Sequence, residues 1–285
     1  MKKPRRLVPA YLAAFAISIY LLPQDHAVAE TLQVNGFEMH YKIIGKGEPL
    51  VLLHGFAVSG ESWDFLSDEF ANDFQLIIPD ARGHGASTNP RNTSIANDQL
   101  AVDTYALLDN LEIKTFKAIG ISMGGETLLY MATQQPERVE AMVLVGTANY
   151  WPESLRELVR SSTAENQSDE QMQKLRKTHK HGDDQIISLF KMNAIAKNNY
   201  NVMNFTPPYL STIKADTLIV HGERDHLFPI NQAIEMYKAI PESLLWIVPN
   251  GAHVPINGFY EEIFVGTAKA FLQGQMTPRR DKTIK

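Results

Sequence analysis

The chain has 285 residues, of which 44% are hydrophobic and 21% are charged, a composition typical of a globular protein with one sizeable core. The net charge of −5 gives no indication of a nucleic-acid-binding surface. The absence of cysteine excludes disulfides, thiolate metal sites, a cysteine nucleophile and lipidation through cysteine.

Residues 1–29 have the order of parts of a secretory signal peptide. Basic residues open the chain, residues 11–22 are mostly apolar, and Ala27-Val28-Ala29 matches the small-residue pattern of a cleavage site. The apolar run is shorter than the roughly 20 residues that a bilayer-spanning helix needs. We therefore favour cleavage before Glu30, with export to the periplasm or the medium, over a retained membrane anchor. Membrane contact is expected only if the segment stays uncleaved.

The rest of the chain alternates short apolar runs with helical patterns. Continuous runs rich in Val, Ile and Leu are typical of strands buried on both faces of a parallel sheet. Expected strands are residues 31–35, 38–44, 50–53, 74–78, 116–121, 141–145, 217–220 and 245–248. Expected helices are residues 95–111, 126–134, 231–239 and 261–272. This alternation predicts βαβ units and an α/β fold with a mostly parallel, doubly wound, eight-stranded sheet.

One long region interrupts the alternation. Residues 149–214 contain no convincing strand and are too long for a simple connection. Helical patterns cover residues 154–159 and 170–177, whereas residues 197–204 are rich in asparagine and are expected to form a loop. We interpret residues 149–214 as a helical lid inserted between two parts of one core, residues 30–148 and 215–272. The polar and basic residues 273–285 are expected to be a flexible tail.

The segment Gly120-Ile121-Ser122-Met123-Gly124-Gly125 lies where an expected strand turns into a helix. Small residues there could simply let the helix pack closely on the sheet. However, Gly-x-Ser-x-Gly in this position is the pattern of a nucleophile elbow, in which a tight turn lifts the serine hydroxyl clear of the sheet. The position after a buried strand favours Ser122 as a nucleophile.

A serine hydroxyl needs a base, and the base needs an acid to fix its tautomer. His253 follows the last expected strand, so its loop opens at the same edge of the sheet as Ser122. Asp225 follows the preceding strand and is the favoured acid, with Glu223 as a weaker candidate. His226 is disfavoured as the base because it is next to the acid in sequence. The chain order Ser122, Asp225, His253 is that of α/β-hydrolases.

Acyl transfer also requires hydrogen-bond donors for the oxyanion. The N–H of Met123, directly after the nucleophile, is one expected donor. The second is expected from the loop His54-Gly55-Phe56 after the third strand, with the N–H of Phe56 as the donor and His54 bracing the loop.

From about residue 31 to residue 272, the chain resembles the α/β-hydrolase superfamily. The resemblance is carried by His54-Gly55-Phe56, by the Pro-Asp-Ala-Arg-Gly-His-Gly segment at residues 79–85, by the elbow at residues 120–125, and by the Asp225 and His253 loops. It implies a structural turn for Asp80, Arg82 and His84. It also disfavours relatives with an aspartate nucleophile, because Ser122 stands at the elbow.

The elbow is similar to those of carboxylesterases, cofactor-free haloperoxidases (perhydrolases) and C–C bond hydrolases. We expect an exported serine hydrolase that cleaves a small or medium carboxylic ester, a small-molecule substrate, without a cofactor. Phe56, Met123 and Trp151 are the expected substrate-binding residues. C–C hydrolysis or peracid chemistry is an alternative, although export argues against the intracellular C–C pathways; a non-catalytic ligand-binding protein is another.

A metal site is a weaker possibility. His179 and His181 lie close in sequence to Asp183 and Asp184, and histidine with carboxylate can hold a metal. Neighbouring lysines favour a solvated loop instead, so no metal is expected.

Overall fold

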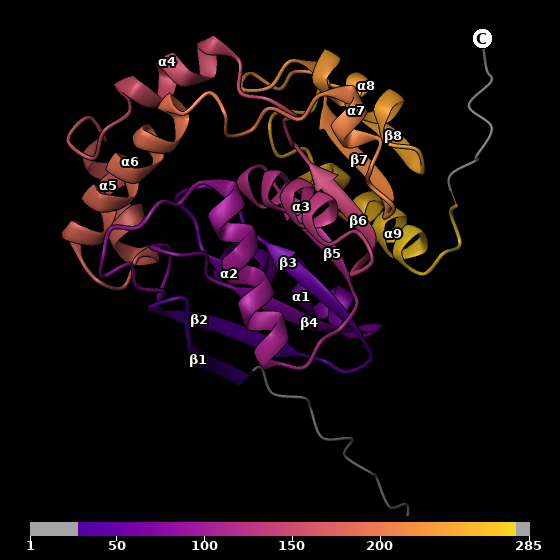
Figure 1. Ribbon diagram of the computed structural model, residues 1–285, viewed down its shortest axis with the longest axis horizontal. Coiled ribbons are helices and arrows are strands. Elements are labelled where there is room, and N and C mark those ends of the chain that lie inside the picture. Colours follow the sequence, from indigo (N-terminus) through magenta and orange to yellow (C-terminus); the bar gives the residue numbers. More distant parts are fainter. Residues whose placement is uncertain (1–27, 278–285) are drawn as a thin grey trace, which may run out of the picture.

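The computed structural model describes residues 28–277, which form a sheet covered by helices on both faces (Figure 1). The strand order is β1-β2-β4-β3-β5-β6-β7-β8. Among these strands β2 is reversed in direction, because it pairs antiparallel with β1 and β4 whereas the remaining pairings are parallel. The strands are Val28–Val34 (β1), Phe37–Ile44 (β2), Glu48–Leu53 (β3), Phe74–Pro79 (β4), Phe116–Ile121 (β5), Val139–Val145 (β6), Asp216–Gly222 (β7) and Ser243–Val248 (β8). The predicted mostly parallel, eight-stranded sheet is confirmed.

The helices divide between the two faces of the sheet. One face is covered by α1 (Asp64–Ala71) and α9 (Glu261–Leu272), which contact each other. The other is covered by α2 (Asn97–Asn110), α3 (Met123–Gln134) and α8 (Ile230–Ala239). The sequence patterns predicted all of these except α1. Because every parallel connection places its helix on a face, the carboxyl ends of β3, β5, β6, β7 and β8 open at one common edge.

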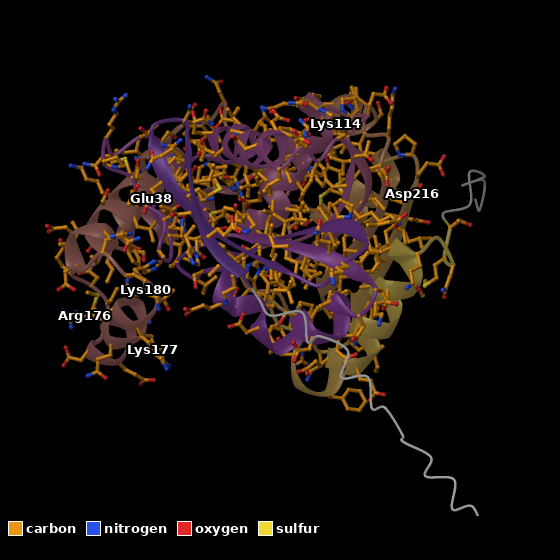
Figure 2. All side chains as sticks on the ribbon, turned by 90° about the horizontal axis from the view of Figure 1, so that it is seen from below. Glu38, Lys114, Arg176, Lys177, Lys180 and Asp216 are labelled. Atoms are coloured by element: carbon orange, nitrogen blue, oxygen red, sulfur yellow. The ribbon has the colours of Figure 1, made fainter. Side chains whose placement is uncertain are left out.

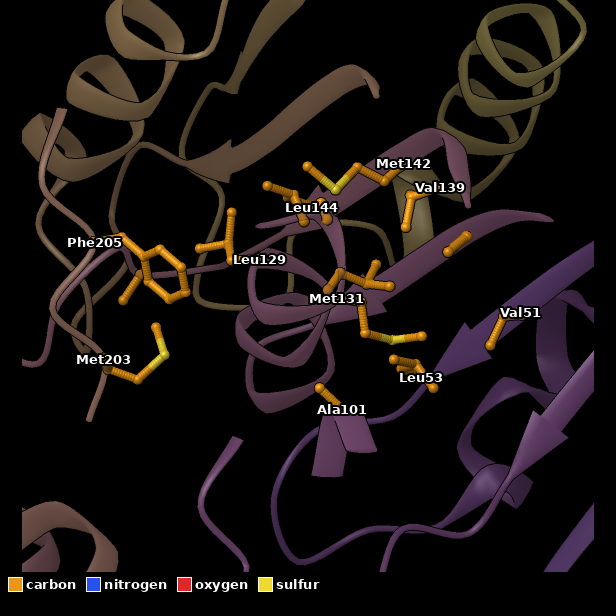
Figure 3. Close-up of a cluster of buried hydrophobic side chains, with 14 of the residues drawn as sticks. Val51, Leu53, Ala101, Leu129, Met131, Val139, Met142, Leu144, Met203 and Phe205 are labelled. Carbon is orange, nitrogen blue, oxygen red and sulfur yellow. The ribbon is translucent and has the colours of Figure 1, made fainter. Parts of the chain in front are cut away.

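Each central strand contributes side chains to both hydrophobic layers. In β3, Val51 and Leu53 point into the core under α2 and α3, whereas Leu50 and Leu52 point into the core under α1 and α9. All four are at most 5% exposed. Figure 3 shows the first of these cores, with Leu129 and Met131 of α3 packed among side chains from β3 and β6. Burial on both faces explains why the strands read as continuous apolar runs.

Four helices lie between β6 and β7. They are α4 (Glu153–Ser161), α5 (Asp169–Thr178), α6 (Asp183–Asn198) and the short α7 (Pro207–Leu210). In Figure 1, α4, α5 and α6 form a separate group beside the carboxyl edge of the sheet. Figure 2 shows Arg176, Lys177 and Lys180 on the outside of this group.

The expectation of a loop over residues 197–204 is wrong at its start, because Lys197 and Asn198 are the last two residues of α6. Asparagine has a low helix propensity, which made this segment resemble a loop. Packing of Ile186 and Phe190 against Leu175 and the partly buried Phe56 stabilises α6 from the tertiary structure instead.

Residues 1–27, which include most of the predicted signal peptide, and residues 278–285, which end the predicted tail, lie outside the described residues. Among helices within residues 28–277, none combines the length and the apolar character that crossing a membrane requires.

Candidate active site

The turn between β5 and α3 holds Ser122 in a strained backbone conformation. Its φ of 51° and ψ of −115° lie in a region that residues with a side chain rarely adopt. A Cβ atom at Gly120 would lie 2.6 Å from the backbone of Gly124, and one at Gly124 would overlap the carbonyl oxygen of Leu53. Both glycines are therefore required by the close approach of α3 to β5 and β3, and the serine is raised above the end of the strand.

Ser122, His253 and Asp225 lie in one chain of hydrogen bonds. Ser122 Oγ is 2.9 Å from His253 Nε2, and His253 Nδ1 is 2.8 Å from Asp225 Oδ2. The three residues come from the loops after β5, β8 and β7, so the common carboxyl edge of the sheet brings them together. In this arrangement the imidazole can take a proton from the serine hydroxyl while the carboxylate orients the ring.

The Asp225 carboxylate is fully buried and well supplied with donors. Its Oδ1 accepts hydrogen bonds from the N–H groups of Leu227 (2.8 Å) and Phe228 (3.0 Å). Burial alone would raise the pKa of Asp225, but the hydrogen bond from His253 and these two backbone donors hold the pKa below its ordinary value. The group is therefore ionised at neutral pH and can stabilise an imidazolium on His253.

Glu223, the weaker candidate for the acid, and His226, the disfavoured candidate for the base, are not part of this chain of hydrogen bonds. Glu223 Oε2 accepts a hydrogen bond from the N–H of Asn250 (2.8 Å) and is exposed. The ring of His226 is 6.5 Å from that of His253. Sequence reasoning missed His221, which is buried in β7 with Nε2 3.9 Å from Asp225 Oδ2 and 3.1 Å from the Phe228 carbonyl. Desolvation by burial lowers the pKa of His221, so it stays neutral beside the carboxylate.

The loop after β3 lies against the elbow. A Cβ atom at Gly55 would be 3.7 Å from Ser122 Cβ, which places the following residue, Phe56, beside the nucleophile. No hydrogen bond of the described residues uses the N–H of Phe56. Met123 is the first residue of α3, so its N–H has no acceptor within the helix. Both amides are available to an oxyanion, and their assignment to that role stays a prediction.

The Asp80–His84 segment is a buried turn next to this loop. Asp80 accepts hydrogen bonds from Gly60 N, Ala86 N and His40 Nδ1 (2.7–3.0 Å). These bonds outweigh desolvation and lower the pKa of Asp80 to about 2. The N–H of Ala81 donates to His54 Nε2 (3.0 Å), so His54 joins the turn to the Phe56 loop.

The turn is also held to α2 and contains a second buried histidine. Arg82 makes a bidentate pair with the buried Asp103 of α2 (2.6 and 2.8 Å). His84 is fully buried and contacts the rings of His54 and Phe56. Both side chains have packing partners here and neither touches the Ser122 hydroxyl.

A cavity of about 200 Å³ opens beside Ser122 under the inserted helices. The expected pocket residues Phe56, Met123 and Trp151 all line it. Its other apolar walls come from the loop before α2, from α4 and α6 and from the loop after β7, and are Ile95, Leu155, Leu158, Val159, Ala196, Leu227 and Phe228. Another tryptophan, Trp63, does not line the cavity, because it is fully buried in the core under α1 and α9. The cavity can hold a small organic group next to the hydroxyl.

Five polar residues of this cavity were not identified from the sequence: Asn97, Glu126, Ser162, Asn193 and Lys197. Glu126 is 1% exposed and accepts hydrogen bonds from Trp151 Nε1 (2.8 Å) and Asn97 Nδ2 (3.2 Å). Lys197 Nζ lies 3.8 Å from Glu126 Oε2 and 3.1 Å from the centre of the Trp151 ring. Desolvation lowers the pKa of Lys197 to about 8, partly opposed by the charge of Glu126. One sequence signal existed: Glu126 follows Ser122 by one helical turn.

The residues of the weak metal motif have other partners. His179 Nδ1 accepts the N–H of Gly85 (3.0 Å), His181 Nε2 lies 2.8 Å from the Ala86 carbonyl, and Asp183 pairs with Arg176 (2.8 Å). Within residues 28–277 no group of three or more His, Asp or Glu side chains has an arrangement that could hold a metal ion.

Several curated relatives match most of the chain. The pimeloyl-[acyl-carrier protein] methyl ester esterase of Nitrosomonas europaea is 26% identical over 253 residues, which covers 79% of this chain and 96% of that protein. The serine hydrolase BPHL of Mus musculus is 28% identical over 233 residues, covering 77% of this chain and 78% of that one.

A solved structure has the same fold. The serine hydrolase CCSP0084 from the polyaromatic hydrocarbon-degrading bacterium Cycloclasticus zankles superposes with a TM-score of 0.75 at 20% identity, over 88% of this chain and 99% of that one. The family model of the alpha/beta hydrolase fold matches residues 48–190, which include the Phe56 loop, the elbow and most of the inserted helices. The chain belongs to the α/β-hydrolase fold family.

Proposed function

We propose that this protein is an exported serine hydrolase that cleaves small or medium-sized carboxylic esters through an acyl-enzyme. The observation that carries this proposal is the hydrogen-bonded chain from Asp225 through His253 to Ser122 at the wall of a mainly apolar cavity. A small organic ester fits such a cavity, which has an apolar surface for the acyl or alcohol part and a nucleophile at its wall.

In the proposed reaction, Ser122 Oγ attacks the ester carbonyl while His253 Nε2 takes its proton. The tetrahedral oxyanion accepts hydrogen bonds from the N–H groups of Met123 and Phe56. His253 then gives its proton to the leaving alcohol, and an acyl group remains on Ser122. Water, deprotonated by His253, attacks the acyl group and releases the acid and the free serine. Asp225 stabilises the imidazolium in both halves of the cycle.

Two of the curated relatives support hydrolysis of a small molecule. One of these two is named a methyl ester esterase and the other a serine hydrolase, and each similarity covers more than three quarters of this chain, at 79% and 77%. The names favour ester chemistry over a purely ligand-binding role, in which the three residues would be retained without turnover.

Hydrolysis of p-nitrophenyl esters from acetate to palmitate, with wild type beside Ser122→Ala, tests the proposal. We expect Ser122→Ala to lose at least roughly 1,000-fold in kcat/KM, since residual catalysis then comes only from binding and the oxyanion donors. Ser161→Ala, at an exposed serine of α4, is the matched control and should keep full activity.

A fluorophosphonate ester gives an independent readout, because it should label Ser122 covalently in the wild type and leave Ser122→Ala unmodified. Turnover or labelling that survives in Ser122→Ala would contradict the serine mechanism. Labelling without turnover of any ester would favour a ligand-binding protein.

Export is the part of the proposal that rests on the sequence of residues 1–29. Cleavage before Glu30 would leave Glu30–Val34 of β1 paired with β2, together with the hydrogen bond from Tyr41 Oη to Glu30 Oε2 (2.7 Å). We expect the intact mass of the protein recovered from the periplasm or medium to correspond to a chain beginning at Glu30. A full-length chain found only in the membrane fraction would contradict cleavage.

A further inference from the structure

The cavity beside Ser122 contains a buried cation that the proposed acyl transfer does not use. Lys197, in the last turn of α6, is 8% exposed and lines the cavity together with Ser122. None of the hydrogen bonds found within residues 28–277 is donated by Lys197 Nζ. Its closest anion, Glu126 Oε2, is at 3.8 Å, beyond hydrogen-bond distance. An ammonium group with three donors and no acceptor faces the space that the substrate would fill.

Glu126 accepts hydrogen bonds from neutral donors and makes none with this ammonium, which lies 3.8 Å from Oε2. Trp151 Nε1 donates to Oε1 and Asn97 Nδ2 donates to Oε2, and both bonds are buried. The stacking of Lys197 Nζ over the Trp151 ring, 3.1 Å from its centre, holds the ammonium in place without using its protons in conventional hydrogen bonds.

A second buried cation lies near the same tryptophan ring. Arg156 of α4 is 3% exposed, and its guanidinium is 5.4 Å from the centre of the same Trp151 ring. Its hydrogen bonds go to the carbonyl oxygens of Trp151, Lys197 and Asn199. In the described part of the chain no carboxylate forms an ion pair with Arg156. Glu153 is the carboxylate whose charge acts on Arg156, whereas Glu126 acts on Lys197. The feature that an anion could use at this end of the cavity is therefore the ammonium of Lys197, which lacks a hydrogen-bond acceptor.

The position of the Lys197 ammonium relative to Ser122 fits one class of substrate. The N–H of Glu126 donates to the carbonyl of Ser122 (2.9 Å), so the two residues are four positions apart on the first turn of α3, about 6 Å along its axis. The cavity lining includes the apolar side chains of Met123, Leu155 and Val159, beside the polar Asn97, Ser162 and Asn193. A molecule that reaches both Ser122 Oγ and Lys197 Nζ has a reactive carbonyl, a short apolar spacer and a terminal anion.

We infer that the cavity selects esters in which one arm ends in a carboxylate, and that Lys197 binds this carboxylate. The inference rests on the proposed ester hydrolysis and adds the chemical class of the substrate. Lys197 acts here as a specificity-determining residue and takes no part in bond making or breaking.

The test compares the monomethyl esters of succinate through suberate with matched half-amides, in which a carboxamide replaces the carboxylate. The ω-acetoxy acids and their amides provide the same comparison with the carboxylate on the alcohol arm. For wild type we expect kcat/KM to be roughly 10- to 100-fold higher for the carboxylates than for the matched amides in one of the two series. This is the usual contribution of a hydrogen bond between two charged groups. The best chain length reports the distance from Ser122 to Lys197.

Variants at Lys197 test whether this residue causes the preference for carboxylates. Lys197→Met should abolish the preference by lowering kcat/KM for the carboxylates far more than for the matched amides, whereas Lys197→Arg should retain much of the preference. Lys191→Met, at an exposed lysine of the same helix, is the matched control and should behave as wild type. Glu126→Gln removes the competing carboxylate and should increase the preference, so the inference stays testable if Lys197→Met does not fold.

Equal turnover of carboxylates and amides by wild type, or a preference that survives in Lys197→Met, would overturn the inference and leave the proposed ester hydrolysis standing. If wild type hydrolyses no ester, the proposed function fails separately. Calorimetry on Ser122→Ala then decides the inference, since monomethyl glutarate should bind at least tenfold more tightly than its half-amide only when Lys197 is present.

Discussion

Asp225 combines full burial of its carboxylate with three hydrogen-bond donors, one of which is His253. The donors keep the group ionised although burial opposes ionisation. In a serine-histidine-aspartate arrangement the negative charge does two things: it selects the tautomer with Nδ1 protonated, and it stabilises the imidazolium that forms during attack. Both effects depend on the charge and not on the shape of the side chain.

Asp225→Asn separates charge from shape. The amide keeps the size of the residue but can donate to Nδ1 and favour the wrong tautomer, so we expect kcat on p-nitrophenyl acetate to fall by about 10⁴-fold with little change in thermal stability. Glu223→Gln is the control, since Glu223 is exposed and contacts only the Asn250 backbone at this site. A larger loss of activity in Glu223→Gln than in Asp225→Asn would assign the acid to Glu223.

The sequence was informative about Ser122, Asp225 and His253 because each follows a recognisable strand, and all strands of a parallel sheet end at one edge. It gave no comparable signal for the contact between Glu126 and Lys197. These residues are 71 positions apart, and their approach depends on how α6 packs over α3, which no local pattern encodes. His221 was missed for a related reason: within an apolar strand it resembles a core residue.

At the scale of elements, the β5–turn–α3 unit depends on the missing side chain of Gly124. A methyl group there would overlap the carbonyl oxygen of Leu53 in β3, and this backbone cannot move without disturbing the central sheet. We expect Gly124→Ala to destabilise the protein by roughly 3 kcal/mol or to prevent folding, since overpacking against rigid backbone is poorly relieved. Urea unfolding and soluble yield measure this effect.

Gly266→Ala is the matched control for the same substitution. Gly266 lies within α9, is exposed, and a Cβ atom there would meet nothing within 4 Å. Alanine should therefore stabilise the helix by about 0.5–1 kcal/mol, because glycine loses more backbone entropy on folding. If both variants had the same stability as wild type, the close approach at the elbow would not be a constraint.

Strands and helices could be predicted from the sequence where burial against the sheet determines the spacing of their apolar residues. The strands of the sheet are buried on both faces, so their apolar runs identified them, and α2, α3, α8 and α9 had an apolar face toward the sheet. The helix α6 was not identified because it ends in asparagines and packs against α5 and the Phe56 loop, not against the sheet. Helices of an insertion are stabilised by contacts with the elements that they cover, and the local sequence pattern does not show which elements those are.

At the scale of the whole molecule, four histidines within residues 28–277 are buried, on elements from different parts of the chain. His54, His84 and His179 form a row of ring contacts from the β3 loop to the end of α5, and His221 lies in β7. Desolvation lowers the pKa of all four, and that of His179 to about 4. In each case the folded protein holds the neutral ring, whereas the unfolded chain protonates it below about pH 6.5.

This distribution predicts acid sensitivity with a defined sign. Below pH 6.5 the unfolded state binds more protons than the native state, so the free energy of unfolding decreases as pH falls. For His179 the loss runs from about pH 6.5 to its folded pKa of about 4, at about 1.4 kcal/mol per pH unit. The lowered pKa of Asp80, about 2, acts in the same direction at lower pH.

Urea unfolding at pH 7.5, 6.0 and 5.0 should show a steep loss of stability. His179→Gln, whose amide oxygen can still accept the Gly85 N–H, should reduce the slope by about one proton, whereas His181→Gln at an exposed histidine should not. A stability that stays constant between pH 7.5 and 5.0 would mean that the buried histidines are protonated in the native protein.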